Sequence, residues 1–157
     1  SIFGWSYGGF AALAGLTLDP ETYRCAVAGA PVADPIEMLN WVMNTTGARN
    51  RQNQGRSFEY WTSAIGDLRD DKEKLQRTSP LANVANVRGP LLLIHGDIDT
   101  TVPIEQSEIM FKAMQEAGKE VEFVILEDED HNITYGETRL QMMEALDSFM
   151  RRCNPPN

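Results

Sequence analysis

The amino-acid sequence predicts an α/β protein in which a mostly parallel sheet is flanked by helices. Short apolar runs, of the kind that form buried strands, alternate along the chain with segments of helical periodicity. A serine between glycines follows the first of these runs, and 157 residues are enough for one domain with a hydrophobic core. Because strands that alternate with helices usually pair in parallel, we expect a single sheet of that kind.

The first predicted element is the end of a strand at residues 1–3, and a helix follows from Tyr7 to Leu18. This helix is rich in Gly, Ala and Leu and apolar nearly all round, which is typical of a helix buried against a sheet. Asp19 and Pro20 end it. Since the chain begins inside a strand and without an initiator Met, we interpret residues 1–157 as the C-terminal part of a longer protein.

Regular alternation of strand and helix patterns resumes later in the chain. The predicted elements are a strand at residues 25–30, a strand at 90–95, a helix at 104–117, a strand at 121–126 and a last helix with apolar positions from Met142 to Met150. The helix at 104–117 is expected to bury one face, formed by Ser107, Met110, Phe111 and Met114.

Residues 34–89 differ in character, because aromatic residues stand there among polar and charged ones. Helical stretches are expected near 35–44, 58–66 and 70–77, and residues 44–55 have the composition of a mobile loop. Two interpretations remain open. This helical excursion could cover a cleft, or it could be a plain helical connection with aromatic core residues.

The strand-to-helix junction at the start carries the first chemical signal. Gly4-Trp5-Ser6-Tyr7-Gly8 fits G-x-S-x-G, the nucleophile elbow, in which a sharp turn presents a serine and the flanking glycines avoid clashes. The dipole of the following helix favours negative charge at Ser6, and the N–H of Tyr7 is a natural donor to an oxyanion.

A serine hydroxyl needs a base, and the chain contains two histidines. His131 lies in a polar loop between a predicted strand and the last helix, so it can reach a cleft at the carboxyl ends of the strands. His95 ends an apolar strand and is followed by Gly96. We therefore predict His131 as the base and His95 as a structural, hydrogen-bonded histidine.

The acid that orients the base is expected in the loop after His95, where Asp97 and Asp99 both lie. Either gives the chain order Ser, Asp, His of α/β hydrolases, and either could instead form a turn or cap a helix. Spacing does not choose between them. Asp128 and Asp130 are too close to His131 in sequence to reach its ring well, and we interpret them as a solvated acidic rim.

The composition excludes some classes of partner. A net charge of −9 and a pI near 4.7 argue against nucleic acid or an anionic membrane surface, and no apolar run approaches the length of a membrane span. Cys25 and Cys153 are far apart and match no metal or redox spacing, so unpaired thiols are expected. The oligomeric state is left open, and so is the compartment, with a periplasmic or secreted location preferred to a cytoplasmic one.

Four motifs in a fixed order span the chain from residue 3 to about residue 150. They are Gly4-Trp5-Ser6-Tyr7-Gly8-Gly9, Ala28-Gly29-Ala30-Pro31-Val32, Leu92-Leu93-Ile94-His95-Gly96-x-x-Asp99-x-x-Val102 and Glu129-Asp130-His131. Together they resemble the catalytic domain of the prolyl oligopeptidase family of serine peptidases, and its bacterial dipeptidyl-peptidase and acylaminoacyl-peptidase-like members most.

This resemblance implies roles for individual residues. Ser6 becomes the nucleophile, Asp99 the orienting acid and His131 the base, while Tyr7, Val32 and Val102 are implied to line the pocket for the residue before the scissile bond. In members like dipeptidyl peptidase IV, aromatic residues soon after A-P-V wall a proline-sized pocket. Here the first aromatic residue after that motif is Trp41, so a strict preference for proline is not predicted.

The function implied by the resemblance is that of a serine peptidase with the α/β-hydrolase fold, acting on short peptides through an acyl-enzyme. An exopeptidase of dipeptidyl or acylaminoacyl type is expected, with a peptide substrate as partner and neither a metal nor an organic cofactor. A carboxylesterase on the same fold and a non-catalytic interaction domain are the alternatives. The resemblance also implies a preceding region with the first strands of the sheet, a second oxyanion donor and a β-propeller.

Overall fold

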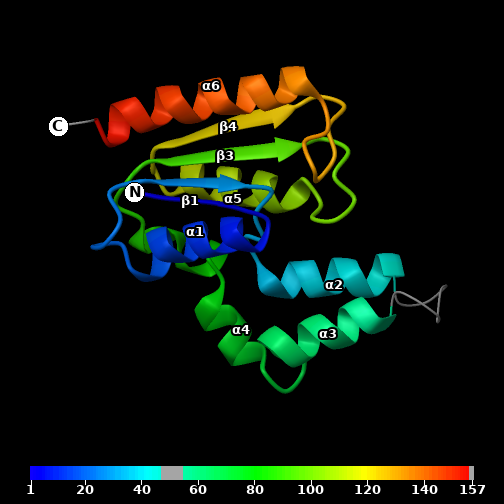
Figure 1. Ribbon diagram of the computed structural model, residues 1–157. Coiled ribbons are helices and arrows are strands. Elements are labelled where there is room, and N and C mark those ends of the chain that lie inside the picture. The colour runs from blue at the N-terminus through cyan, green and yellow to red at the C-terminus, as the bar shows by residue number, and fades with distance from the viewer. Residues whose placement is uncertain (47–54, 156–157) are drawn as a thin grey trace.

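The computed structural model describes residues 1–46 and 55–155, and a four-stranded parallel sheet runs through it (Figure 1). The strands lie in the order β1 (Ile2–Trp5), β2 (Ala26–Gly29), β3 (Leu91–Gly96) and β4 (Val121–Leu126), and each pairs in parallel with the next. The predicted parallel α/β sheet is therefore confirmed, and the strands begin and end within two residues of the expected positions.

The two central strands are buried on both faces, because their side chains alternate between two apolar clusters. In β3, Leu91 and Leu93 belong to one cluster, whereas Leu92 and Ile94 belong to the other. This alternation follows from the two-residue period of a strand and explains why β3 is an uninterrupted apolar run in the sequence.

Helices cover both faces of the sheet (Figure 1). On one face lie α1 (Tyr7–Leu18), α5 (Glu105–Glu116) and the short 3₁₀ helix η1 (Leu81–Asn86), and on the other lies α6 (Gly136–Cys153). The predicted inner face of α5 is borne out by buried Ser107, Met110 and Met114.

The excursion between β2 and β3 forms a group of helices beside the sheet. It consists of α2 (Pro35–Thr46), α3 (Gly55–Ile65) and α4 (Lys72–Thr78), close to the three helical stretches that the sequence predicts. The expected loop at 44–55 is corrected at its start, since residues 44–46 continue α2. The last residue of that loop, Gly55, begins α3, and residues 47–54 lie outside the described residues.

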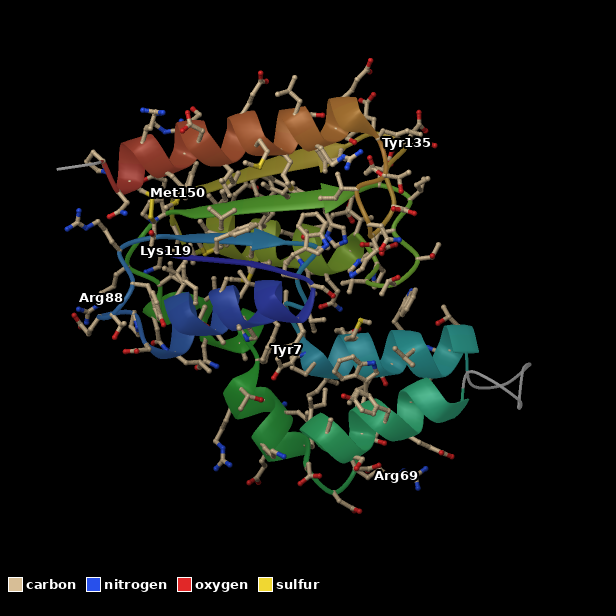
Figure 2. All side chains as sticks on the ribbon, in the orientation of Figure 1. Tyr7, Arg69, Arg88, Lys119, Tyr135 and Met150 are labelled. Carbon is tan, nitrogen blue, oxygen red and sulfur yellow. A yellow bond between two sulfur atoms is a disulfide. The ribbon has the colours of Figure 1, made fainter. Side chains whose placement is uncertain are left out.

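The expectation of unpaired thiols is wrong, because Cys25 and Cys153 form a disulfide with their Cα atoms 6.2 Å apart. Cys25 comes just before β2, and Cys153 is the last residue of α6, the helix whose Met150 is labelled in Figure 2. Since α6 runs back along the sheet against the direction of the strands, its end meets the start of β2. A separation of 128 residues along the chain therefore gave no indication of the distance in space.

Within the described part of the chain, we find no helix with both the length and the apolar character needed to cross a membrane.

Candidate active site

Ser6 occupies a strained turn between β1 and α1. Its backbone has φ 59° and ψ −120°, a region that residues with a side chain rarely adopt. Two backbone hydrogen bonds hold it there: the N–H of Ser6 donates to the carbonyl of Gly29 at 2.8 Å, and its carbonyl accepts from the N–H of Phe10 at 3.1 Å. The turn is therefore fixed by its place between a sheet neighbour and the first turn of α1.

The two glycines of the G-x-S-x-G motif have different roles. A Cβ atom at Gly4 would stand 2.0 Å from the carbonyl oxygen of Gly8, so only glycine fits there. A Cβ at Gly8 would meet nothing within 4 Å. The sequence-based view that both flanking positions must be glycine to avoid a clash is thus corrected: the steric demand falls on Gly4, and the backbone of Gly8 imposes it.

His131 joins Ser6 to Asp99 through hydrogen bonds at both ring nitrogens. Its Nε2 is 2.9 Å from the Ser6 Oγ, and its Nδ1 is 2.6 Å from the Asp99 Oδ2. Because an ionised carboxylate only accepts, Nδ1 carries the proton in a neutral ring, and Nε2 is left to accept the Ser6 hydroxyl. The Trp5 indole N–H donates to the His131 carbonyl at 3.0 Å and holds this loop against the elbow.

Asp99 is the acid that reaches His131, with a fully buried side chain. Its Oδ1 accepts from the N–H groups of Thr101 and Val102 at 2.8 and 3.0 Å, which leaves Oδ2 toward His131. Burial alone would raise the pKa of Asp99. Hydrogen bonds from His131 and His95 and from those two N–H groups outweigh burial and hold this pKa far below its usual range, so the side chain is an anion.

Asp97, the alternative that the sequence left open, has a different partner. Its Oδ1 accepts the N–H of Glu129 at 3.3 Å, which ties the loop after β3 to the loop after β4. The predicted acidic rim at Asp128 and Asp130 lies at the surface beside them, where Asp128 is exposed and the Asp130 Oδ1 accepts the N–H of Asn132 at 2.8 Å.

His95 is buried and hydrogen-bonded, as the sequence suggests for a structural histidine. Its Nδ1 lies 2.7 Å from the Ser107 Oγ on α5, and its Nε2 lies 2.9 Å from the carbonyl oxygen of Val102. Its Nε2 also lies 3.4 Å from the Asp99 Oδ2.

Glu129 is a residue at this site that sequence reasoning missed. Its side chain is fully buried and accepts from the N–H groups of Thr134 and Tyr135 at 2.6 and 3.1 Å and from the Thr138 hydroxyl. Burial would raise the pKa of Glu129, but these donors lower it. The carboxylate thereby closes the loop that carries His131 onto the start of α6. In the sequence, Glu129 stands out only within the Glu129-Asp130-His131 motif, which gives it no role.

The Tyr7 N–H belongs to the first residue of α1, where backbone N–H groups have no partner within the helix. It adjoins Ser6, which is the position that the sequence predicts for an oxyanion donor. The Tyr7 ring is exposed and stacks against Trp61 of α3, with ring centroids 6.4 Å apart.

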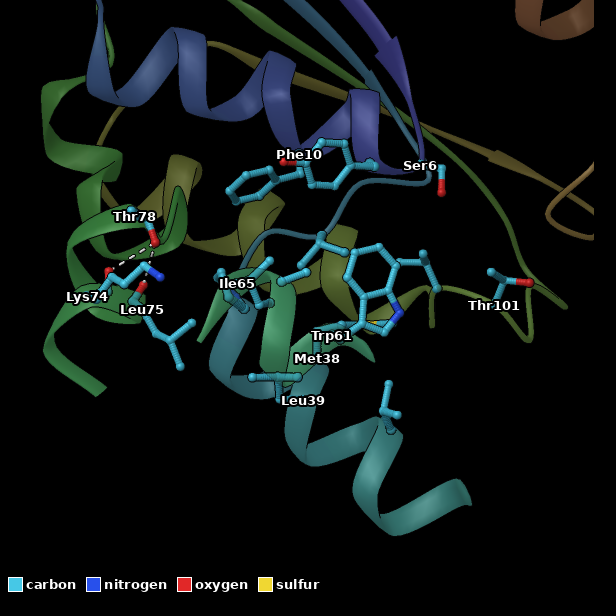
Figure 3. A pocket seen from close by; sticks show the side chains of 16 residues that line it. Ser6, Phe10, Met38, Leu39, Trp61, Ile65, Lys74, Leu75, Thr78 and Thr101 are labelled. Atoms are coloured by element: carbon cyan, nitrogen blue, oxygen red, sulfur yellow. Dashed lines mark hydrogen bonds between the residues drawn. The ribbon is translucent and has the colours of Figure 1, made fainter. Parts of the chain in front are cut away.

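A cavity of about 260 Å³ opens beside Ser6 (Figure 3). All three residues predicted to line a substrate pocket border it, namely Tyr7, Val32 and Val102. Helices of the excursion supply most of the other walls. The further lining residues are Phe10, Pro35, Met38, Leu39, Val42, Trp61, Ala64, Ile65, Lys74, Leu75, Thr78 and Thr101.

Over the residues that the structure describes, no group of three or more His, Cys, Asp or Glu side chains is arranged to hold a metal ion.

Comparison with known proteins gives a family match over nearly the whole chain. The model of the prolyl oligopeptidase family matches residues 1–155. Dipeptidyl aminopeptidase BIII of Pseudoxanthomonas mexicana is 31% identical over 155 residues, covering 98% of this chain and 21% of that protein. The acylamino-acid-releasing enzyme of Rattus norvegicus is 28% identical over 156 residues, covering 96% of this chain and 19% of that enzyme.

Solved structures agree on the fold. The acylaminoacyl peptidase of Pyrococcus horikoshii superimposes with a TM-score of 0.80 at 24% identity, covering 97% of this chain and 23% of that one. The predicted α/β-hydrolase fold is thereby confirmed. The chain spans about a fifth of the length of the curated relatives it matches.

Proposed function

The chain belongs to the prolyl oligopeptidase family, and from this premise we propose that it carries the catalytic triad of a serine peptidase that cleaves short peptides. The observation that carries the proposal is the pair of hydrogen bonds from Ser6 Oγ to His131 and from His131 to Asp99. A nucleophile, a base and an acid in this chain order and geometry are the parts that acyl transfer requires.

In the proposed reaction, the Ser6 Oγ attacks the carbonyl carbon of the substrate while the His131 Nε2 takes its proton. Asp99 holds the ring in the tautomer with the proton on Nδ1 and stabilises the imidazolium that forms. The imidazolium then protonates the leaving amine, which departs and leaves an acyl-enzyme. Water, deprotonated by His131, releases the acyl group and restores the Ser6 hydroxyl.

The oxyanion of each tetrahedral intermediate is assigned to the N–H of Tyr7. This donor adjoins the nucleophile at the N-terminus of α1, where the helix dipole favours negative charge. We also propose a second donor from a region that precedes residue 1, which would carry the first strands of the sheet and a β-propeller, as the family resemblance implies. We propose residues 1–157 as the C-terminal part of that catalytic domain.

The cavity beside Ser6 is proposed to hold the side chain of the acyl residue, and the excursion at 34–89 to cover the cleft around it. Met38, Leu39 and Trp61 extend the apolar lining beyond Tyr7 and Val32. Apolar walls select apolar groups, because a charged group would lose its hydration there. We therefore propose a larger apolar residue, such as Phe or Leu, in preference to proline.

An exopeptidase of dipeptidyl or acylaminoacyl type is the finer proposal, supported by the relatives named dipeptidyl aminopeptidase and acylamino-acid-releasing enzyme. A carboxylesterase would use the same triad. An interaction domain without catalysis would have no need of three aligned side chains.

The test compares kcat/KM in the full-length protein for dipeptidyl p-nitroanilides, N-acyl-aminoacyl p-nitroanilides and a p-nitrophenyl ester, with Ser6→Ala as control. Cleavage of amides that depends on Ser6 supports the peptidase, and the better amide tells whether a free or a blocked N-terminus is read. Turnover of the ester alone would make the protein an esterase. Cleavage that survives in Ser6→Ala would remove Ser6 from its role.

A further inference from the structure

The hydrogen bonds around His95 fix which of its ring nitrogens carries the proton. The carbonyl of Val102 only accepts, so the Nε2 that lies 2.9 Å from it must donate. In a neutral ring Nδ1 is then an acceptor, and it accepts the Ser107 hydroxyl at 2.7 Å. The His95 ring is therefore held from two sides, by β3's own loop and by α5.

The same Nε2 also lies close to Asp99. It lies 3.4 Å from the Asp99 Oδ2, the oxygen that receives the His131 Nδ1–H at 2.6 Å. The side chains of His95 and Asp99 are both fully buried, so this contact is not screened by water. One carboxylate oxygen thus lies between two imidazole N–H groups.

We propose that His95 is a positioning residue for the reaction: its Nε2–H keeps the Asp99 carboxylate aimed at His131 and shares its negative charge. The inference rests on the proposed function. It goes beyond a structural histidine, since a residue that only supports the fold would not alter how readily His131 takes a proton.

The other ionisable side chains of these loops have hydrogen-bond partners of their own. On the same loop, the Asp97 Oδ1 accepts the Glu129 N–H. On the loop after β4, the Glu129 side chain is directed to the start of α6 and the Asp130 Oδ1 to the N–H of Asn132. The Ser6 Oγ is hydrogen-bonded to His131, and α5 contributes the neutral Ser107. Among the residues that the structure describes, His95 and His131 are the two basic side chains within 4.0 Å of the Asp99 Oδ2.

A matched pair of variants separates the two nitrogens of His95. The amide of His95→Gln reaches the former place of Nε2 and keeps a donor toward Val102 and Asp99. The amide of His95→Asn reaches only the place of Nδ1, so it keeps a partner for Ser107 and loses that donor. Ser107→Ala is the control for the lost support of α5, which His95→Gln also suffers.

In the full-length protein, the measurements are thermal unfolding and the pH dependence of kcat/KM on the best p-nitroanilide. Without the donor, the charge of Asp99 holds a protonated His131 more tightly, so a higher pH is needed to free the base. We expect the acid limb of His95→Asn to move up by about half a pH unit and kcat to fall about tenfold, because one buried N–H contact with a carboxylate is lost. The acid limbs of His95→Gln and Ser107→Ala should stay where the wild type has them.

An unmoved acid limb in a folded His95→Asn, or an equal shift in Ser107→Ala, would overturn the proposal. Should His95→Asn not fold, the ¹⁵N resonance of His95 Nε2 in the wild type decides. A chemical shift of this resonance that changes with pH at the midpoint of the acid limb supports the contact with Asp99. A shift that stays constant with pH contradicts it.

The failure of the proposed function is distinguishable from the failure of this inference. A fluorophosphonate probe reports whether Ser6 is a nucleophile without reference to His95. If the probe does not label Ser6 in the wild type, the proposed function fails. If it labels Ser6 and the acid limb of His95→Asn is unmoved, the inference alone fails.

Discussion

Two regions meet at Ser6, and they are built in different ways. At the carboxyl ends of the strands, buried carboxylates collect several N–H groups each, as Asp99 and Glu129 do. In the excursion, the contacts that shape the cavity are between apolar side chains, such as those of Leu39, Trp61 and Leu75. The hydrogen bonds of the first region determine how its side chains are oriented, and the apolar side chains of the second determine the size of the cavity.

This difference predicts how each region responds to change. A hydrogen-bond partner in a buried polar network has one correct orientation, and its loss leaves other groups unpaired. An apolar wall tolerates substitution of similar volume and loses selectivity gradually. Substitutions at the strand ends should therefore affect turnover, and substitutions in the excursion should affect the choice of substrate.

The largest effect is expected for Asp99→Asn. An amide in that place cannot accept the His131 proton and the two loop N–H groups together, so the base loses its correct tautomer. We expect kcat to fall by about 10⁴-fold, the loss seen when the acid of a serine-protease triad becomes an amide. Asp97→Asn is the matched control, and kcat within about threefold of wild type is expected because its contact is a single long hydrogen bond. Equal losses in both variants would contradict the assignment of Asp99.

Glu129→Gln should come next. One of its oxygens would become an NH₂ group facing backbone donors at the start of α6, and the His131 loop would shift. A displacement of about 1 Å in a catalytic group costs about 100-fold in rate, which is the fall in kcat that we expect with KM little changed. Glu127→Gln, at an exposed neighbouring position, should match the wild type.

The same variant tests the lowered pKa of Glu129. A carboxyl whose pKa is lowered by folding stabilises the fold above the unfolded pKa of about 4.3, and this contribution is lost as the pH falls toward the folded value. The deficit in Tm of Glu129→Gln should therefore be greatest above about pH 5 and shrink as the solution becomes more acidic. A deficit that is constant with pH would mean that the charge of Glu129 does not stabilise the fold.

Trp61→Ala should change selectivity more than turnover. Its ring forms part of the cavity wall and stacks on Tyr7, so its removal enlarges the space for the acyl side chain. We expect the preference for Phe over Ala in the acyl position to fall by about tenfold in kcat/KM, since differences of a few methylene groups are worth about that much in an apolar pocket. Met43→Ala, on an exposed face of α2, is the control. A loss of kcat on every substrate would show that the excursion also orients the triad.

The smallest effect is expected for Asp34→Ala. The Asp34 Oδ1 accepts the N–H groups of Ile36 and Glu37 at 2.7 and 3.1 Å at the start of α2, and its Oδ2 accepts the Ser79 hydroxyl after α4. Loss of such a cap should lower the free energy of unfolding by about 1 kcal/mol, with little change in kcat. Glu37→Gln keeps the capping contacts and should unfold like the wild type in the same thermal measurement.

The sequence was most informative where local chemistry and long-range placement agree. Periodicity located the strands and helices, and the elbow around Ser6 follows from a turn in which Gly4 leaves no room for a side chain. His131 as base followed from its position after a strand. Asp99 could not be separated from Asp97 by spacing, because that choice depends on which carboxylate the backbone of Thr101 and Val102 turns toward His131.

The sequence did not reveal two features that depend on the tertiary structure, namely a buried carboxylate in an acidic run and a disulfide. Glu129 lies in an acidic run, which is typical of solvent-exposed surface. Its side chain is nevertheless fully buried and accepts the N–H of Thr134, just before α6. Cys25 and Cys153 match no short spacing, since their pairing depends on the direction of the last helix across the sheet. Neither fact is encoded within a window of neighbouring residues.

The Cys25–Cys153 bond divides the proposed triad between the inside and the outside of a covalent ring. Asp99 and His131 lie within the ring, and Ser6 lies on the free arm before it. A single backbone cut anywhere between the two cysteines, for example in the excursion, would leave both pieces joined until the bond is reduced. On a denaturing gel such a nicked chain keeps one band without reductant and gives two with it, so a cut in the helices around the cavity would go unnoticed unless reductant is added.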